Sequence, residues 1–369
     1  MLAIKKIDPS CIESEVFELL KSHNYKPKKH RVFIKPNIVG PVKPESGVVT
    51  HPKVVEGVIR YLKSIQINDI YIGDGPCIEE VDYVYKKTGY RELCRRLGVV
   101  LVDLHKEKRE KIKFRNRWVL LPKIVLESEY LNIAKLKTHI QTTVSLCTKN
   151  QKGLLDLKTK RAFHKDLDKN IAALANAIKP SLCIIDAITA IEGNGPGQMG
   201  CLVKNLDLIV IGDNMRDVDE IGCRIFGLKG SKIEHLKLCS DHTTQHARRL
   251  VLPKIAHSFI IPPPIKYGET QTLRRFNLYL HYAQGACSGC TVLIGQLKGS
   301  LIRSPITFLR MGVHSLIEPI HFITGEHKKL ALKGKLICIG NCTKKIKRKK
   351  NDLFVPGCPP KVEDVVKKL

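Results

Sequence analysis

Short apolar segments alternate with amphipathic helical segments through residues 1–255, and this alternation restricts the fold more than any other feature of the sequence. Several apolar segments, such as Leu182–Ile185, contain no polar residue, which is typical of strands that are covered on both faces. Strands separated by helices form mostly parallel sheets, so the sequence predicts an α/β fold with a helix-covered, mostly parallel sheet. The predicted strands are 31–35, 69–72, 98–104, 130–133, 182–186 and 207–211.

Two predicted helices carry apolar residues at the spacing of one buried face. In the first helix these residues are Ile12, Val16, Leu19 and Leu20. The second helix is expected to begin near Pro52, with Thr50 as its cap. Proline is tolerated in the first turn of a helix because the backbone N–H groups of that turn have no acceptor within the helix. Its predicted buried residues are Val54, Val55, Val58, Ile59 and Leu62.

The character of the sequence changes near Ile260. The segment that follows contains three consecutive prolines, Pro262–Pro264, which fit neither a helix nor a central strand. Beyond it we expect a strand at 335–339 and a closing helix from Val362. We therefore predict two domains, residues 1–260 and a smaller, cysteine-rich α/β domain of residues 261–369.

Polar side chains follow several predicted strands, at the sheet edge where open α/β sheets bind ligands. Asp74, Asp186 and Glu192 are candidate metal ligands or proton carriers at this edge. They would also serve as ordinary loop caps and turn residues, and the residues alone leave both interpretations open. The basic members of the group, which would line an anion site, are Lys35, Lys135, Lys137 and His139.

Short motifs in this region occur in the order and spacing of a known family. They are Ile34-Lys35-Pro36-Asn37, Thr50-His51-Pro52, Gly73-Asp74-Gly75-Pro76, Leu136-Lys137-Thr138-His139, Lys149-Asn150, Gly153-Leu154, His164, Ile185-Asp186 and Glu192-Gly193-Asn194-Gly195-Pro196. Through these motifs, residues from about 31 to 240 resemble the family called domain of unknown function 362 (DUF362). The resemblance implies no particular reaction.

A ligand crevice at the strand ends would draw its catalytic residues from these motifs. The candidates are Lys35, Lys137, His139, His164, Asp186 and Glu192. We expect at least three of Lys35, Lys137, His139 and Asp186 to meet in one concave pocket. Histidine titrates near neutral pH, so His139 and His164 are the expected proton carriers.

The sequence indicates neither a known nucleotide-binding motif nor a membrane-spanning segment. Gly195–Gly200 fits the glycine pattern of dinucleotide-binding loops, but no amphipathic helix follows it, and the sequence contains no Gly-Lys-Ser/Thr phosphate loop. No apolar leader is visible, and no uncharged segment approaches the roughly 18 residues of a spanning helix. We therefore expect a cytoplasmic protein with no membrane contact.

Five of the 13 cysteines lie beyond residue 280, close to one another and to glycines. An iron–sulfur cluster needs four thiolates, and neighbouring glycines let the backbone approach the cluster. Cys287, Cys290, Cys342 and Cys358 form such a set, and the chain continues after Gly357-Cys358 with Pro359-Pro360. The pattern resembles the proximal-cluster site of the nickel–iron hydrogenase small subunit and of its respiratory complex I relative. This resemblance implies a [4Fe–4S] cluster on these four cysteines, without nickel.

Other uses of these cysteines remain open. Cys287, Cys290, Cys338 and Cys342 have spacings that suit a structural zinc site, although this leaves Cys358 and its prolines unexplained. A redox dithiol at Cys287 and Cys290 lacks a thioredoxin-like surrounding sequence. Cys338 lies within a predicted strand and is expected to be a buried thiol.

The net charge of +28 fits several kinds of partner. The leading hypothesis is an iron–sulfur protein, an oxidoreductase or an electron-transfer subunit, which moves electrons between its cluster and an unidentified small-molecule ligand in the strand-end crevice. The basic segment Lys344–Lys350 would attract an acidic redox partner protein. The alternative is a basic nucleic-acid-binding protein with a structural zinc site, although no segment interleaves aromatic residues with arginine as single-strand binders do.

Overall fold

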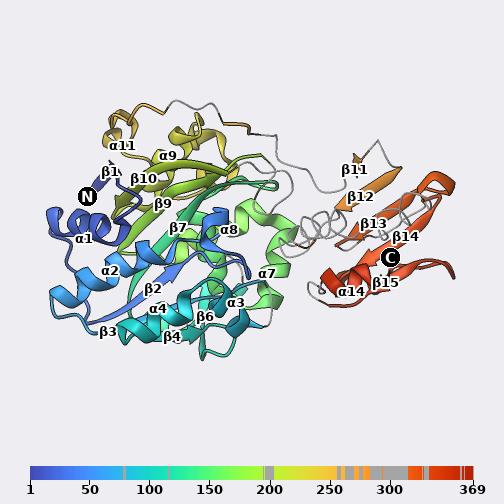
Figure 1. Ribbon diagram of the computed structural model, residues 1–369, viewed down its shortest axis with the longest axis horizontal. Helices are drawn as coiled ribbons and strands as arrows, with labels where there is room; N and C mark the ends of the chain where they lie inside the picture. The colour runs from blue at the N-terminus through green and yellow to red at the C-terminus, as the bar shows by residue number, and fades with distance from the viewer. Residues whose placement is uncertain are drawn as a thin grey trace.

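The computed structural model covers the full chain and describes residues 1–77, 80–114, 117–193, 195, 203–255, 259–261, 270–273, 277–282, 293, 315–325, 327, 332–357, 360 and 362–368. Figure 1 shows two separate sheets within these residues. The larger is an eight-stranded, mostly parallel sheet with helices, and the smaller is a five-stranded sheet in the C-terminal region. This arrangement confirms the predicted fold class.

The larger sheet is parallel over most of its width and antiparallel at one edge. The sequence did not predict its edge strand β1 or the antiparallel pairing of β1 with β10 and of β10 with β9. In spatial order the strands are β1 (Leu2–Lys6), β10 (Val203–Gly212), β9 (Leu182–Ile191), β7 (Glu129–His139), β2 (Arg31–Pro36), β3 (Asp69–Asp74) and β4 (Val100–Asp103), and β8 (Thr143–Ser145) pairs with β7. A hairpin of β5 (Arg109–Phe114) and β6 (Arg117–Pro122) forms a sheet of its own.

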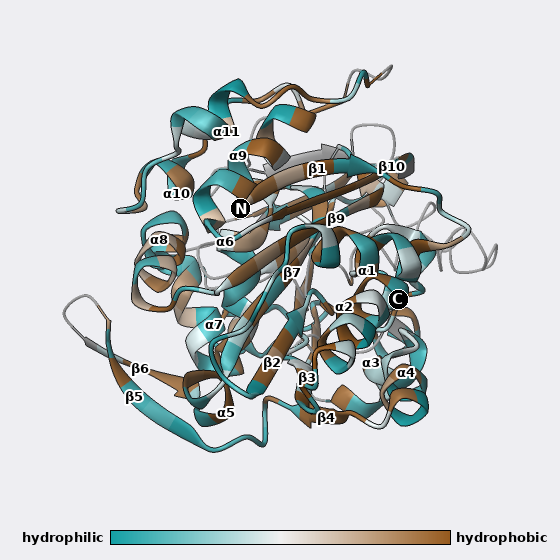
Figure 2. Ribbon diagram, turned by 90° about the vertical axis from the view of Figure 1, so that its left-hand side faces the viewer, coloured by the Kyte–Doolittle hydropathy of each residue, from teal (hydrophilic) through white to brown (hydrophobic). Residues whose placement is uncertain are grey.

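Helices cover both faces of this sheet (Figure 2). Alternate residues of each strand point to opposite faces, so Val32 and Ile34 pack in one core and Phe33 packs in another. One face carries α1 (Ile12–Ser22), α2 (Pro52–Ser64), α3 (Val81–Lys87) and α4 (Tyr90–Leu97). The other face carries α6 (Cys147–Asn150), α8 (Leu167–Ala177), α9 (Met215–Ile225) and α10 (Glu234–Lys237). The remaining helices of this unit are α5 (Lys123–Glu127), α7 (Leu157–Phe163) and α11 (Gln245–Arg249).

The start of α2 shows how the strand-end loops are held. The cap is His51, whose Nδ1 accepts a hydrogen bond from the Lys53 amide at 3.2 Å, so the prediction of Thr50 as cap was wrong. The hydroxyl of Thr50 instead donates to the carbonyl of Ile133 on β7 at 2.9 Å. Thr50 therefore ties the loop before α2 to the sheet rather than satisfying the helix.

The smaller sheet has four parallel strands and one antiparallel edge strand. It consists of β11 (Thr270–Leu273), β12 (Leu278–Tyr282), β13 (Ile320–Thr324), β14 (Lys335–Ile339) and β15 (Leu353–Val355), and α14 (Val362–Val366) follows. The predicted strand at 335–339 and the helix from Val362 are confirmed. Residues 262–269 lie outside the described part, so the domain boundary stays a prediction. No helix in the described part is long and apolar enough to cross a membrane.

Candidate functional site

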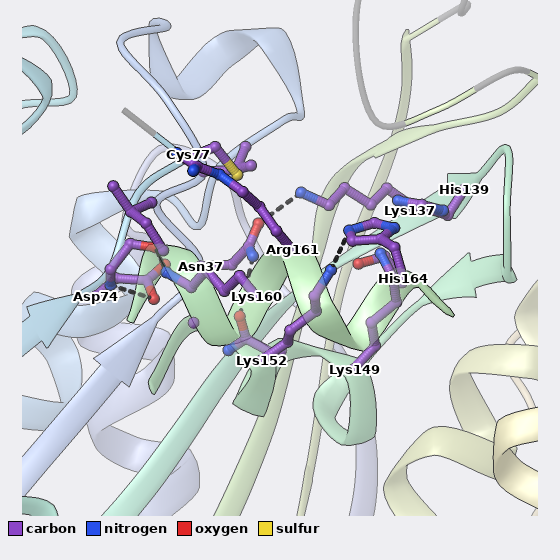
Figure 3. Close-up of a pocket in the computed structure, with 16 residues that line it drawn as sticks. Asn37, Asp74, Cys77, Lys137, His139, Lys149, Lys152, Lys160, Arg161 and His164 are labelled. Carbon is purple, nitrogen blue, oxygen red and sulfur yellow. Dashed lines mark hydrogen bonds between the residues drawn. The ribbon is translucent and has the colours of Figure 1, made fainter. Parts of the chain in front are cut away.

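A cavity of about 90 Å³ lies beside the carboxyl ends of β2, β3 and β7 (Figure 3). Its lining is strongly basic, and Asp74 carries the one carboxylate among the described residues that form it. The basic residues around the cavity come from β7 and from the segment that follows β8: Lys137, His139, Lys149, Lys152, Lys160, Arg161 and His164. The site therefore has a surplus of positive charge in a partly enclosed space.

The carboxylate of Asp74 is already neutralised by a lysine beneath the cavity. Its Oδ1 lies 2.8 Å from Nζ of Lys35, and both side chains are buried. Its Oδ2 accepts a hydrogen bond from the Ile38 amide at 2.6 Å. The packing leaves no room for a side chain at Gly153, because an added Cβ would collide with the Asp74 carboxylate and lie 2.6 Å from Lys35 Nζ. Asp74 thus compensates Lys35 rather than the cations of the cavity.

Two of the cavity lysines donate only to neutral acceptors. Nζ of Lys137 lies 2.6 Å from Oδ1 of Asn37 and 2.6 Å from the carbonyl of Val48. Nζ of Lys160 donates to the carbonyl of Gly75 at 2.5 Å. Burial lowers the pKa of Lys137 to about 7 and that of Lys160 to about 8, and the charge of Asp74 offsets only part of the loss of hydration.

Lys149 has a different environment from the other cavity lysines. The structure gives its ammonium group no hydrogen-bond acceptor and no ion-pair partner within the described residues, although the residue is only 8% exposed. Burial, followed by the nearby charges of Lys152 and Lys137, holds its pKa well below the usual value. Lys149 is therefore an amine that loses its proton easily and lines the cavity.

Two histidines complete the wall. Nε2 of His164 lies 2.5 Å from Nζ of Lys152, a contact that requires the neutral ring as acceptor when the lysine is protonated. Nδ1 of His139 accepts a hydrogen bond from the Gln141 amide at 3.1 Å. Burial and then the charges of Lys149 and Lys152 hold the pKa of His139 well below its usual value. The low pKa of His139 favours its neutral ring, and the Nε2 atom of His164 accepts from Lys152 when that ring is neutral.

The segment with most of these cations is anchored to the sheet by buried hydrogen bonds. The Asp219 carboxylate, from α9, accepts from the Cys147 and Thr148 amides at 2.8 Å each and so fixes the start of α6. Oδ1 of Asn150, at the end of α6, accepts from Nζ of Lys35 at 3.0 Å and from Nδ2 of Asn37 at 2.9 Å. Lys149 is thus held between two fixed points.

The structure brings some of the predicted site residues together and separates others. Lys137, His139 and His164 line the cavity, and Lys35 lies directly beneath it through Asp74.

The other two candidates have separate partners. Asp186 pairs with Lys135 at 2.8 Å and accepts from the His51 amide at 2.8 Å. Glu192 accepts from the Ile260 amide at 2.8 Å. In these contacts both carboxylates act as structural caps, and in the described part of the chain no three metal-binding side chains converge.

Four cavity cations were not among the candidate site residues, although the first of them belongs to a family motif: Lys149, Lys152, Lys160 and Arg161. They lie on α6, on the short 3-10 turn Gln151–Leu154 and on α7, rather than directly after a strand. The density of basic residues between 149 and 165 was an available signal.

The proposed cluster site lies largely outside the described residues, which omit Cys287, Cys290 and Cys358. Cys342 follows β14, in a turn that is tied to the segment before Cys358. The Asn341 amide donates to the carbonyl of Gly357 at 2.8 Å, and the Gly357 amide donates to Oδ1 of Asn341 at 2.9 Å. Gly357 has a φ of 130°, which favours glycine at this position.

Cys338 packs within the sheet instead. Its side chain is buried in a cluster with Ile323 and Leu336. Burial raises the pKa of its thiol to about 11. The side chain therefore has the surroundings expected of an inert buried thiol.

Comparison with known proteins agrees with the motifs of the cavity region. The chain is 27% identical over 201 residues to the thylakoid-associated protein sll1697 of Synechocystis sp., an alignment of 51% of this chain and 62% of that relative. The chain thus covers less than two thirds of that protein. The family model described as Domain of unknown function (DUF362) matches residues 32–224, which is more than half of the chain and includes the whole cavity. This chain therefore belongs to the DUF362 family.

Proposed function

We propose that this protein binds a small anion in the basic cavity of its DUF362 domain and exchanges electrons through an iron–sulfur cluster on its C-terminal cysteines. The observation that carries the first part is the surplus of buried cations. Buried charges are costly unless an opposite charge compensates them, and the one carboxylate of the described lining is already paired with Lys35. An anion with two or more negative charges would supply the missing compensation.

The donors around the cavity suit phosphate and carboxylate groups. Lys137 and Lys160 are localised ammonium donors, whereas Arg161 presents a planar fork that matches two oxygens of one anionic group. The small volume of the cavity fits one phosphate or carboxylate group that is attached to a few further atoms. A phosphorylated or carboxylated metabolite is therefore the proposed class of ligand.

Replacement of Lys160 tests the anion site directly. Lys160→Met should weaken binding of inorganic phosphate about 10- to 100-fold, because a hydrogen bond to a charged group contributes roughly 1.5–3 kcal/mol. Isothermal titration calorimetry measures the affinity, and ligand-induced thermal stabilisation gives a second readout. Lys158→Met is the matched control, since Lys158 is exposed on the same helix. If the unaltered protein binds neither phosphate, sulfate nor a dicarboxylate, the proposal is wrong.

The second part of the proposal is supported by the environment of Cys342 and Cys338. The Cys342 turn is hydrogen-bonded to Gly357, the residue that precedes Cys358 in the sequence, and this supports the assignment of both cysteines to one cluster. The buried thiol of Cys338 favours the cluster set over a zinc set that includes it. A cluster held there would supply one-electron transfer, while this chain's glycine-flanked loops would position the thiolates.

The iron–sulfur assignment and the zinc assignment predict opposite outcomes for two cysteine substitutions. Cys358→Ser should remove most of the dithionite-bleachable visible absorbance of anaerobically prepared protein, whereas Cys338→Ser should retain it. A structural zinc site on Cys287, Cys290, Cys338 and Cys342 would reverse this ranking and yield zinc without sulfide on metal analysis. Equal retention in both variants would contradict the four-cysteine assignment.

The exposed basic loop after Cys342 supports an acidic redox partner as part of the same proposal. Residues Lys344, Lys345 and Lys347 are exposed there, as are the three basic residues that follow. Complementary charge at such a loop speeds association and makes its rate fall with added salt. Nucleic-acid binding with a structural zinc remains the alternative, and finding zinc in place of iron and sulfide would favour it.

A further inference from the structure

We propose that Lys149 is a nucleophilic amine, which forms an imine with a carbonyl group carried by the anion in the cavity. This inference rests on the proposed anion binding and assigns a covalent step to that site. It makes the substrate a carbonyl compound with a nearby phosphate or carboxylate group.

The contacts of Lys149 separate it from every other buried lysine of the site. Lys35 pairs with Asp74, while Lys137 and Lys160 donate to fixed oxygens. Lys149 lines the cavity without an acceptor in the described part of the chain, so its Nζ is free to approach a bound ligand. A lysine that only completed the protein's own packing would need an acceptor to offset its burial.

The backbone that carries Lys149 is fixed in place. The Asp219 carboxylate holds the first turn of α6, and Asn150, the next residue, is bound to Lys35 and Asn37. The amine therefore approaches the cavity from an anchored position. Such positioning lowers the entropic cost of bringing a nucleophile to a bound carbonyl.

The surrounding cations serve two purposes. Burial, and after it the charges of Lys152 and Lys137, keep the pKa of Lys149 well below the usual value, and this favours the free base that is needed for attack. The same cations attract the anionic group of the ligand. Figure 3 shows Lys149 and Lys152 side by side on one wall, with the ring of His164 next to them.

The step needs no oxidant or reductant. The lone pair of Nζ attacks the carbonyl carbon, and a C–N bond replaces the C–O bond. The two hydrogens of the amine leave with the carbonyl oxygen as water, so atoms and charge balance. His164 and His139, which both lie on the cavity wall, are the side chains that would carry the protons between nitrogen and oxygen.

The size and charge of the cavity limit the ligand. A volume of about 90 Å³ suits a compact molecule whose carbonyl lies within a few bonds of its anionic group. Short 2-oxo acids and small ketone or aldehyde phosphates share this chemistry. The experiment below distinguishes the two by using one probe of each kind.

Reductive trapping tests the inference. The full-length protein is incubated separately with pyruvate and with dihydroxyacetone phosphate, treated with sodium borohydride, and analysed by intact and peptide mass spectrometry. We expect one reduced adduct per chain, located on Lys149, with at least one of the probes. Inorganic phosphate should suppress the adduct by competition, and Lys149→Met should abolish it.

Controls keep the result interpretable. Lys158→Met, which replaces an exposed lysine of α7, should retain the adduct. Lys149→Arg keeps a cation, and should bind phosphate yet give no adduct even if Lys149→Met fails to fold. An adduct that survives in Lys149→Arg, or labelling spread over surface lysines, would overturn the inference. Phosphate binding without an adduct from either probe would overturn it as well, while leaving the anion site intact.

Discussion

Asp186→Asn should destabilise the protein by about 3–5 kcal/mol, because it leaves a buried lysine without its counter-charge. Nζ of Lys135 lies 2.8 Å from Oδ1 of Asp186, and the two side chains are 1% and 0% exposed. The same carboxylate accepts hydrogen bonds from the amides of His51 and Ile188. Its loss therefore affects β7, β9 and the start of α2 together. The midpoint of urea unfolding measures the change in the free energy of unfolding.

Two further variants show whether the buried charge is the cause. Asp241→Asn breaks the solvent-exposed Lys179–Asp241 pair of 2.6 Å and should cost less than about 1 kcal/mol. The double variant Lys135→Met/Asp186→Leu removes both buried charges and should recover a large part of the stability that Asp186→Asn loses. If Asp186→Asn costs no more than the surface variant, Lys135 is not held as a buried cation.

Sulfate affinity should fall steeply as the pH rises from about 7 to about 10. Burial lowers the pKa of Lys137 to about 7 and that of Lys160 to about 8, so both amines lose their protons in this range in the ligand-free protein. A bound anion favours the protonated forms, so binding takes up protons. Each proton taken up reduces affinity by up to tenfold per pH unit. Sulfate is the suitable probe because its own charge does not change in this range.

The stability of the ligand-free protein should change in the opposite direction. Because both lysines have folded-state pKa values below the ordinary lysine value, the unfolded chain binds more protons than the folded chain between about pH 7 and pH 10. The contribution of these two lysines to the free energy of unfolding therefore increases with pH through this window. Lys137→Met should reduce the pH dependence of both the sulfate affinity and the free energy of unfolding. An affinity that is constant or increases with pH would contradict a site built on these amines.

The fold was predictable where apolar runs were continuous and less so where charges lie inside strands. β2, β3 and β9 begin where the sequence indicated, since each contains apolar residues that are largely buried. β7 continues six residues beyond the predicted end at Ile133, because Lys135 pairs with Asp186 and the Lys137 ammonium group donates a hydrogen bond to Asn37, both from other elements. A local pattern contains no information about such partners. An apolar segment likewise does not show whether its strand pairs with a parallel or an antiparallel neighbour.

The candidate site was predictable in part for a similar reason. Lys137 and His139 follow the rule that ligands bind at the carboxyl ends of parallel strands, and they do line the cavity. Asp186 ends a predicted strand by the same rule but faces Lys135 instead. Lys149 and Lys160 lie on short helices that return over the strand ends, and their approach depends on long-range contacts such as that of Asp219 with α6.

The position of β1 at the sheet edge restricts how this chain completes its fold during synthesis. β1 (Leu2–Lys6) is synthesised long before β10 (Val203–Gly212), its one partner in the described sheet. At roughly 5–20 residues per second, about 200 further residues take on the order of 10–40 s to be made. The central strands β2, β3 and β7 emerge during this interval, whereas the first strand must remain unpaired and accessible to chaperones until β10 emerges. Synonymous changes that slow translation before residue 203 would lengthen that exposure and lower the yield of soluble protein.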